Sequence, residues 1–272
     1  MKINRELAAL ILAVIGIPAI YFGGLYFFIV FSGMVAIAAW EFGRLFRPLD
    51  VQPFTALTVG GTLMVLLSRA YFPEIVVPWL TIVILAVMTV YLVAYEAGRD
   101  RAATDFAVTI AAIMYLGWIG SYFFALRSLP QGLGWFILVM APLWVGDSVA
   151  FYIGSHYGKH KMTPRLSPKK SWEGYIASVI GGGLAGILVG FVLNLVGWLN
   201  VTLFNGLIIG LLMGAIPTLG DLGESMIKRQ AGIKDSGGLI PGHGGAFDRI
   251  DSWLWAATIG YFYISMFVLF IR

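Results

Sequence analysis

No charged side chain interrupts the stretch GYIASVIGGGLAGILVGFVLNLVGWLNVTLFNGLIIGLLMGAIPTLG, Gly174–Gly220. A helix needs about 20 apolar residues to cross the hydrocarbon core of a bilayer. The stretch is too long for one crossing and long enough for two, and the segment GWLNVT at 197–202 is where we expect a break. It therefore predicts two membrane-spanning helices joined by a turn.

The rest of the chain repeats this pattern of long runs without charge. The composition is 59% hydrophobic and 12% charged, with a mean hydropathy of +0.87, which excludes an ordinary soluble domain. A membrane β-barrel would show alternation with a period of two and more charge. The run 7–40 is also too long for one crossing and should break near Pro18 or Gly23. We therefore expect an all-α polytopic integral membrane protein with about nine transmembrane helices, from the runs 7–40, 51–68, 75–95, 106–126, 128–146, 174–220 and 252–271.

The basic residues predict the orientation of these helices. With nine spans, the connecting segments alternate between two sides, and one side receives all but three of the 18 Lys and Arg residues. Positively charged residues are retained in the cytoplasm. We therefore expect a cytoplasmic N-terminus, an outside C-terminus and cytoplasmic loops at 156–173 and 222–250. Six basic residues of these loops are interpreted as topology signals that also attract anionic lipid headgroups, namely Lys2, Arg5, Arg44, Arg47, Arg99 and Arg101.

Several of the few acidic residues lie within or at the ends of the apolar runs. Asp147 comes late in the sixth expected span, Asp221 and Glu224 end the eighth, and Asp248 and Asp251 open the ninth. An ionisable group at membrane depth is costly and is therefore a functional candidate. Helix capping is the alternative for Asp251, because an acid in the first turn complements the helix dipole. Asp147 and Asp221 are expected near helix C-terminal ends, where capping does not account for them.

These acids favour a metal and polyphosphate site. The chain has no cysteine and only three histidines, and carboxylates alone suit a hard cation such as Mg²⁺, which is often held together with substrate phosphates. The segment KDSGGLIPGHGGAFDRID, 234–251, adds glycine-rich backbone whose N–H groups can form a phosphate-binding nest. Nearby Lys and Arg side chains would complete the anion site. His243 is interpreted as a hydrogen-bond donor to phosphate or an anchor of this loop, with a general base as the alternative.

A second loop has a similar composition. In RLSPKKSWEG, 165–174, Lys169 and Lys170 are flanked by the hydroxyl groups of Ser167 and Ser171. Two interpretations remain open for this loop. It grips phosphate through its lysines and hydroxyl groups, or it forms the entry to the next helix with Ser171 as the N-cap.

The segment 225–251 resembles the signature of phosphatidate cytidylyltransferases (CDP-diacylglycerol synthases) of the bacterial type. Two upstream elements of that family are also matched, D-x-x-A-F-x-x-G at Asp147–Gly154 and SPKKSWEG at 167–174. The specific part of the resemblance covers about 140–251, and the first five spans are similar only in being hydrophobic. The fixed positions of the signature are met by Ser225, Lys228, Arg229, Lys234, Asp235, Pro241, His243, Gly244, Gly245, Asp248, Arg249 and Asp251.

The resemblance implies an enzyme that converts CTP and phosphatidic acid to CDP-diacylglycerol and pyrophosphate. It implies Mg²⁺ as the cofactor, with one ion or two left open, and membrane lipids rather than nucleic acid as surroundings. A homodimer is one of the assemblies that it leaves open. The enzyme would lie in the inner (cytoplasmic) membrane with its active site facing the cytoplasm. The chain would form a single membrane domain, 1–272, with N-terminal spans at about 1–126 and a catalytic half at about 132–272.

The resemblance also implies roles for individual residues. The expected metal ligands are Asp221 and Asp248, with Asp147, Glu224 and Asp251 as further candidates. The phosphates of CTP and phosphatidate would contact Ser167, Lys169, Lys170, Ser171, Gly242, Gly244 and Gly245. The remaining catalytic candidates are Lys228, Arg229, Lys234, Asp235, His243 and Arg249.

Three alternative functions share some of the features expected of the synthase. A CTP-dependent lipid or polyprenol kinase shares the nucleotide, metal and membrane but transfers the γ-phosphoryl group. A CDP-alcohol phosphotransferase would need a D-x-x-D-G-x-x-A-R run, which GDLGESMIKR does not provide. A transporter should show broken helices near mid-membrane and related halves, whereas the polar groups here gather at one face.

Overall fold

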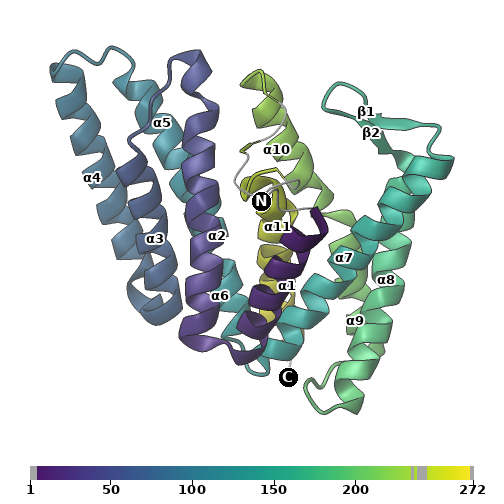
Figure 1. Ribbon diagram of the computed structural model, residues 1–272. Coiled ribbons are helices and arrows are strands. Elements are labelled where there is room, and N and C mark those ends of the chain that lie inside the picture. Colours follow the sequence, from purple (N-terminus) through teal and green to yellow (C-terminus); the bar gives the residue numbers. More distant parts are fainter. Residues whose placement is uncertain (1–4, 234–235, 238–243, 270–272) are drawn as a thin grey trace. The chain divides into compact units, whose positions relative to one another are not determined.

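The computed structural model describes residues 5–233, 236–237 and 244–269, and its regular elements are helices apart from one small hairpin (Figure 1). The α-helices are α1 (Arg5–Phe22), α2 (Gly24–Leu45), α3 (Thr55–Tyr71), α4 (Val76–Glu96), α5 (Ala102–Ala112), α6 (Tyr122–Arg127), α7 (Gly132–Tyr157), α8 (Trp172–Leu195), α9 (Leu203–Ala215), α10 (Thr218–Gln230) and α11 (Phe247–Tyr263). Short 3₁₀ turns η1 (Arg47–Leu49) and η2 (Pro73–Ile75) precede α3 and α4, and π-helical stretches η3 (Ile113–Ile119) and η4 (Ile264–Leu269) follow α5 and α11. Strands β1 (Lys161–Thr163) and β2 (Ser167–Ser171) pair antiparallel.

The described residues contain seven helical segments that are long and apolar enough to cross a membrane. The prediction of an all-α polytopic membrane protein is therefore confirmed. Helices α1 and α3 correspond to the two other expected spans and have 18 and 17 residues. At 1.5 Å per residue, α3 is about 25 Å long, shorter than a typical hydrocarbon core of about 30 Å. The count of nine thus stays a prediction. The seven segments are Gly24–Leu49, Pro73–Glu96, Ala102–Arg127, Gly132–Tyr157, Trp172–Leu195, Leu203–Gln230 and Phe247–Leu269.

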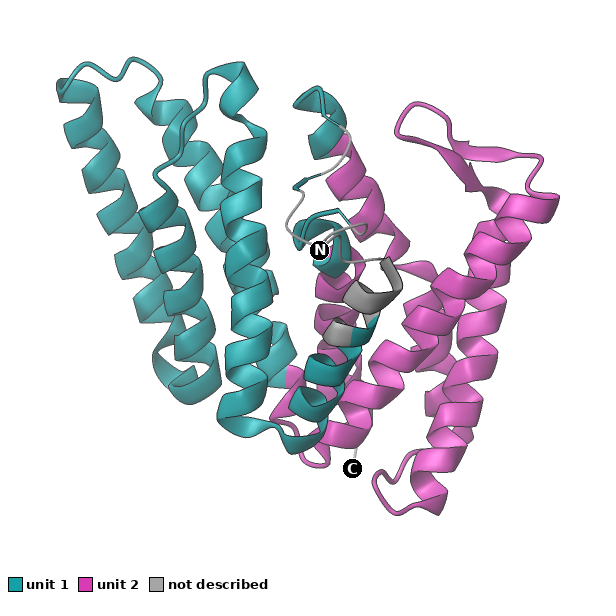
Figure 2. Ribbon diagram, viewed as in Figure 1, with its two compact units in different colours: residues 1–125, 227–250 teal, residues 126–226, 251–272 magenta. Residues whose placement is uncertain are grey.

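The chain divides into two compact units (Figure 2). Unit 1 comprises residues 1–125 and 227–250, and unit 2 comprises residues 126–226 and 251–272. The first boundary falls between residues 125 and 126. The segment 227–250, however, groups with the N-terminal helices. The single catalytic half stays a prediction, and most of the glycine-rich signature belongs to unit 1.

Glycines set the packing of α8 against α9 in unit 2. A Cβ atom added to Gly186 would lie 2.2 Å from the carbonyl oxygen of Gly206, and one added to Gly210 would lie 2.2 Å from that of Gly182. Such small residues at four-residue spacing let two membrane helices approach backbone to backbone. The long charge-free stretch therefore forms a tight helical pair.

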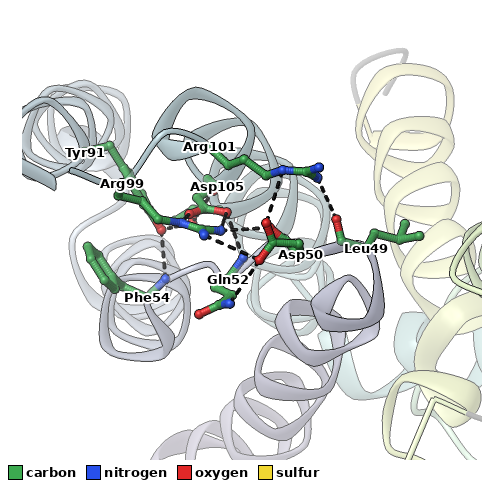
Figure 3. Close-up of polar contacts among 9 residues, drawn as sticks. Leu49, Asp50, Gln52, Phe54, Tyr91, Arg99, Arg101 and Asp105 are labelled. Carbon is green, nitrogen blue, oxygen red and sulfur yellow. Dashed lines mark hydrogen bonds and ion pairs between the residues drawn. The ribbon is translucent and has the colours of Figure 1, made fainter. Parts of the chain in front are cut away.

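A polar cluster ties together the helix ends of unit 1 (Figure 3). The buried carboxylate of Asp105 accepts hydrogen bonds from Arg99 Nε at 2.7 Å and from the backbone N–H of Gln52 at 2.7 Å. Arg101 donates to the carbonyl oxygen of Leu49 and pairs with Asp50. The hydrogen bond to Asp105 raises the pKa of the Arg99 guanidinium above its usual value. Both arginines therefore have partners within the protein, beyond the topology role expected of them.

Candidate active site

Three acidic side chains come together in unit 2. Asp221 and Glu224 lie three residues apart on α10, so they share a face of that helix, and Asp251 lies on α11. One carboxylate oxygen from each residue lies within 4.8 Å of the other two. The side chains of Glu224 and Asp251 are buried, and Asp221 is partly exposed. This donor set, made only of carboxylate oxygens, fits a hard cation such as Mg²⁺.

Local backbone features position this group of carboxylates. Pro217 lies between α9 and α10, so the helix ends at Ala215 and restarts at Thr218. The absence of a side chain on Gly220 lets α10 approach α11, because an added Cβ would lie 2.5 Å from the carbonyl oxygen of Asp251. The expectation that Asp221 ends a span was wrong. It lies in the first turn of α10, where the helix dipole favours a negative charge.

The basic loop of unit 2 reaches the same acids. Its lysine Lys170, on β2, places its Nζ atom 2.6 Å from Asp221 Oδ2. The carboxylate of Asp147 interacts electrostatically with both Lys170 and Asp221. Asp147 itself lies well inside α7, which continues to Tyr157 rather than ending at residue 146 as the charge pattern suggested. The structure therefore brings Asp147, Lys170 and Asp221 into one neighbourhood, although Asp147 is not among the three clustered ligand candidates.

The remaining residues of this loop form a hairpin that leads into α8. Ser171 is the N-cap of α8, and its hydroxyl oxygen accepts the N–H of Gly174 at 3.2 Å. This confirms the capping interpretation, while a contact of Ser171 with phosphate stays a prediction. Ser167 begins β2 and lies opposite Thr163, and Lys169 is exposed. The pairing of the two strands holds Lys169 and Lys170 on a short rigid element rather than on a free loop.

A second polar network lies in unit 1 around Asp248. Lys228 Nζ pairs with one carboxylate oxygen of Asp248. The other oxygen accepts the backbone N–H of Gly245 at 2.8 Å and both the backbone N–H and the hydroxyl of Ser236, at 3.1 and 2.8 Å. Gly244 adopts a φ of +78°, and a Cβ there would lie 2.7 Å from Asp248 Oδ2. The backbone N–H groups of Gly245 and Ser236 thus hold the Asp248 carboxylate, while the phosphate-binding nest and a metal-ligand role for Asp248 stay predictions.

Sequence reasoning missed Glu41, which anchors this network from α2. The side chain is 1% exposed, and its Oε2 atom accepts the N–H of Phe247 at 2.9 Å and the hydroxyl of Ser236 at 3.3 Å. A Cβ on Gly237 would lie 2.3 Å from Glu41 Oε1. An acid that ends a long charge-free run was the available signal. This signal was not sufficient, because no residue near Glu41 in the sequence links it to the signature.

The other predicted residues are exposed or lie outside the described chain. Arg229 on α10 and Arg249 on α11 have exposed side chains. Four of the predicted site residues fall outside the described residues, namely Lys234, Asp235, Gly242 and His243.

A polytopic membrane protein that combines clustered carboxylates with partly buried lysines has the features of a membrane enzyme that acts on phosphorylated substrates. A family model described as "Cytidylyltransferase family" matches residues 3–267. The chain belongs to this family of nucleotidyltransferases, as the signature indicated.

Two named relatives of the family match nearly the whole chain, and a third matches about half of it. A phosphatidate cytidylyltransferase of Synechocystis sp. is 30% identical over 98% of this chain and 97% of its own. A phosphatidate cytidylyltransferase of Pseudomonas aeruginosa is 34% identical over 92% of both chains. One from Haemophilus influenzae is 45% identical over 51% of this chain and 48% of its own. The similarity to enzymes of this name therefore includes the N-terminal helices, where the sequence offered only hydrophobicity.

Proposed function

We propose that this enzyme transfers the cytidylyl group of CTP to phosphatidic acid, giving CDP-diacylglycerol and pyrophosphate, as a step of phospholipid biosynthesis. The observation that carries the proposal is the group of Asp221, Glu224 and Asp251, with Lys170 beside it, in a chain whose full-length relatives are named phosphatidate cytidylyltransferases. Acids and bases packed together in this way suit two polyanionic substrates and a cation.

The reaction needs no protein nucleophile. A phosphate oxygen of phosphatidic acid forms a bond to the α-phosphorus of CTP, and the bond from that phosphorus to the bridging oxygen of the β-phosphate breaks. The electron pair leaves with pyrophosphate. Catalysis of such a transfer depends mainly on holding the two phosphates in line and on stabilising the charge that develops. The chain offers carboxylates and lysines for these tasks.

The carboxylates Asp221, Glu224 and Asp251 would hold Mg²⁺. When bound, the ion supplies charge stabilisation at the phosphoryl oxygens. The proposal keeps Asp147 and Asp248 as further ligands, which leaves room for a second ion. Lys170 balances the charge of Asp221 and is in position to contact a phosphate that displaces this pairing.

The basic and glycine-rich residues of the signature would bind the phosphates. Lys228 is held by Asp248, which fixes its ammonium group in place. The exposed guanidinium groups of Arg229 and Arg249 remain accessible to substrate. We assign the same phosphate-binding role to Ser167, Lys169, Ser171, Lys234, Gly242, Gly244 and Gly245, with Asp235 and His243 as further catalytic candidates.

We expect label in the α-phosphate of CTP to enter the lipid when phosphatidic acid is the acceptor. The reason is that the lipid phosphate attacks the α-phosphorus, so the label stays with the cytidylyl group while pyrophosphate leaves. The measurement is thin-layer separation of the lipid products with α- and γ-labelled CTP in parallel. Lys228→Ala should lose this transfer, because Lys228 is a buried cation of the signature held by Asp248.

The same measurement separates the alternative kinase from the synthase. A CTP-dependent kinase would carry γ-label into a lipid alcohol and release CDP. Entry of γ-label, or no transfer to phosphatidic acid by the wild-type protein, would overturn the proposed function.

We further propose that the enzyme lies in the inner membrane, with the N-terminus inside and the C-terminus outside. The loops at 156–173 and 222–250 would then face the cytoplasm. Because the chain has no cysteine, single cysteines report on this directly. We expect Lys159→Cys to react with a membrane-impermeant maleimide only after the cells are opened, and Ser128→Cys to react in intact cells. The opposite pattern would contradict the orientation, since CTP is a cytosolic nucleotide.

A further inference from the structure

A cavity in unit 1 joins the end of α2 to the signature. It has a volume of about 380 Å³ and is lined by residues of α2, η1 and the signature, namely Trp40, Glu41, Arg44, Leu45, Pro48, Ile233, Ser236 and Gly237. The guanidinium carbon of Arg44 lies 4.5 Å from the centre of the Trp40 ring. Arg44 is exposed and forms no ion pair with any described residue. The cavity therefore presents a cation without a carboxylate partner in the described part of the chain.

An apolar groove adjoins this cavity between α2 and α3. It has a volume of about 800 Å³ and shares Trp40 with the cavity beside Arg44. A Cβ added to Gly60 would meet no atom within 4 Å, so the groove is open at this glycine. The other residues that line it are Ala36, Ile37, Thr55, Ala56, Val59 and Leu63.

The dimensions of the groove match one leaflet of a bilayer. Its lining on α3 runs from Thr55 to Leu63, which corresponds to about 12 Å at the rise of an α-helix. Half of a hydrocarbon core is about 15 Å thick. Arg44 lies one helical turn beyond Trp40, which places it about 6 Å past the groove. A molecule that fills both spaces would therefore have an anionic headgroup and an acyl chain in the same leaflet.

The charges around Arg44 are consistent with an anionic headgroup. The nearest acid on α2 is Glu41, and its Oε2 atom is taken by Phe247 and Ser236 while the side chain is buried. Arg44 stacked on Trp40 is thus the charged group that the cavity exposes. Arginine recognises phosphate through paired N–H groups.

We propose that this groove and Arg44 form the binding site for the lipid substrate. One acyl chain of phosphatidic acid would lie between α2 and α3 along Ala56 and Gly60, and its phosphate would contact Arg44 beside Ser236 and Gly237. The inference rests on the proposed function, because it names the site for one of the two substrates. It also gives the substrate a path from the bilayer to the signature without leaving the apolar phase.

Gly60→Leu tests the acyl-chain part of the site. A Cβ at this position meets no protein atom within 4 Å and Gly60 lines the groove, so we expect a leucine there to compete with the acyl chain and to raise the KM for dioleoyl phosphatidic acid at least about tenfold. The KM for dioctanoyl phosphatidic acid should change much less, and the KM for CTP should not change. The matched control is Gly33→Leu on α2, where an added Cβ also meets nothing within 4 Å and which does not line the groove.

Arg44→Ala tests the headgroup part. We expect the KM to rise about tenfold for both the long-chain and the short-chain phosphatidic acid, because the lost contact is to the phosphate. Arg44→Lys should restore part of the loss, and Arg47→Ala, whose side chain lies outside both spaces, should behave as wild type. A uniform loss of kcat in Arg44→Ala with unchanged KM would contradict the proposal.

Two further outcomes are informative. If Gly60→Leu keeps the wild-type KM for dioleoyl phosphatidic acid but changes the oligomeric state in detergent, a second copy of the chain covers the groove and the proposal is wrong. Phosphatidic acid with a photoreactive group at the chain end should label α2 and α3 of the wild-type protein, and labelling elsewhere would overturn the site. This labelling needs no turnover, so it distinguishes failure of the lipid site from failure of the proposed reaction.

Discussion

Asp221→Asn is expected to lower cytidylyl transfer by at least about a hundredfold, an effect of the size seen when one group that stabilises transition-state charge is removed. The substitution keeps the shape of the side chain and removes the charge that a divalent cation requires. Asp221 combines two contacts, since it belongs to the group with Glu224 and Asp251 and pairs with Lys170 at 2.6 Å. The substitution therefore weakens the cation site and also removes the ion pair of Lys170.

Binding of Mn²⁺ gives a readout of Asp221→Asn that is independent of turnover. We expect electron paramagnetic resonance titrations to show weaker Mn²⁺ binding in Asp221→Asn and in Glu224→Gln. Asp50→Asn is the matched control, because Asp50 is an exposed acid whose surface ion pairs contribute little. Near-normal turnover and Mn²⁺ binding in both site variants would remove the proposed cation site.

Asp251→Asn separates the two interpretations of that residue. Asp251 Oδ1 accepts the backbone N–H of Ser252, and the side chain is also one of the three clustered carboxylates. Helix α11 begins at Phe247, so Asp251 lies beyond its first turn and the capping interpretation was wrong. If Asp251 serves only its local hydrogen bond, the asparagine keeps an oxygen acceptor and the loss of activity should be mild. A loss as large as that of Asp221→Asn would instead assign Asp251 to the cation site.

Gly210→Val is expected to lower the free energy of unfolding by at least about 2 kcal/mol, an effect of the size seen in overpacked cores. The first side-chain carbon alone would lie 2.2 Å from the carbonyl oxygen of Gly182, and backbone atoms cannot move away as a flexible side chain can. We expect a lower Tm in detergent and a smaller yield of monodisperse protein. Gly33→Val, in open space on α2, should retain the wild-type Tm. An unchanged Tm in Gly210→Val would show that α8 and α9 are not packed through their glycines.

The helices were predictable where composition alone decides them. The break of the stretch 174–220 falls at 196–202, close to the predicted segment GWLNVT, because the helix ends where polar and turn-forming residues interrupt the apolar run. Two helix boundaries were missed because helix ends were predicted from the positions of charged residues. The charge of Asp147 does not end α7, and Pro217 starts a new helix inside an uncharged run. The charge of a residue decides whether it is favoured in water or in lipid, whereas the pattern of backbone hydrogen bonds decides where a helix ends.

The candidate site was predictable where its residues are neighbours in the chain. The spacing of Asp221 and Glu224 and the Ser171 cap are local, so residue types and intervals were enough to find them. The partners of these residues were not predictable. Lys170 on β2 pairs with Asp221 on α10, and helices α8 and α9 lie between these two elements in the chain. No pattern in either segment indicates that the other segment supplies its partner.

The amino-acid sequence by itself determined that this is a helical membrane protein and that it carries the signature of its family, because burial in lipid and a fixed spacing of residues are both written in the local order of the chain. Only the tertiary structure decided which acids share a site and which arginines are used for packing. It also decided that Glu41 holds Phe247 from 206 positions away. Contacts at that separation depend on how glycine and proline let helices approach and break, and such packing is a property of the whole fold.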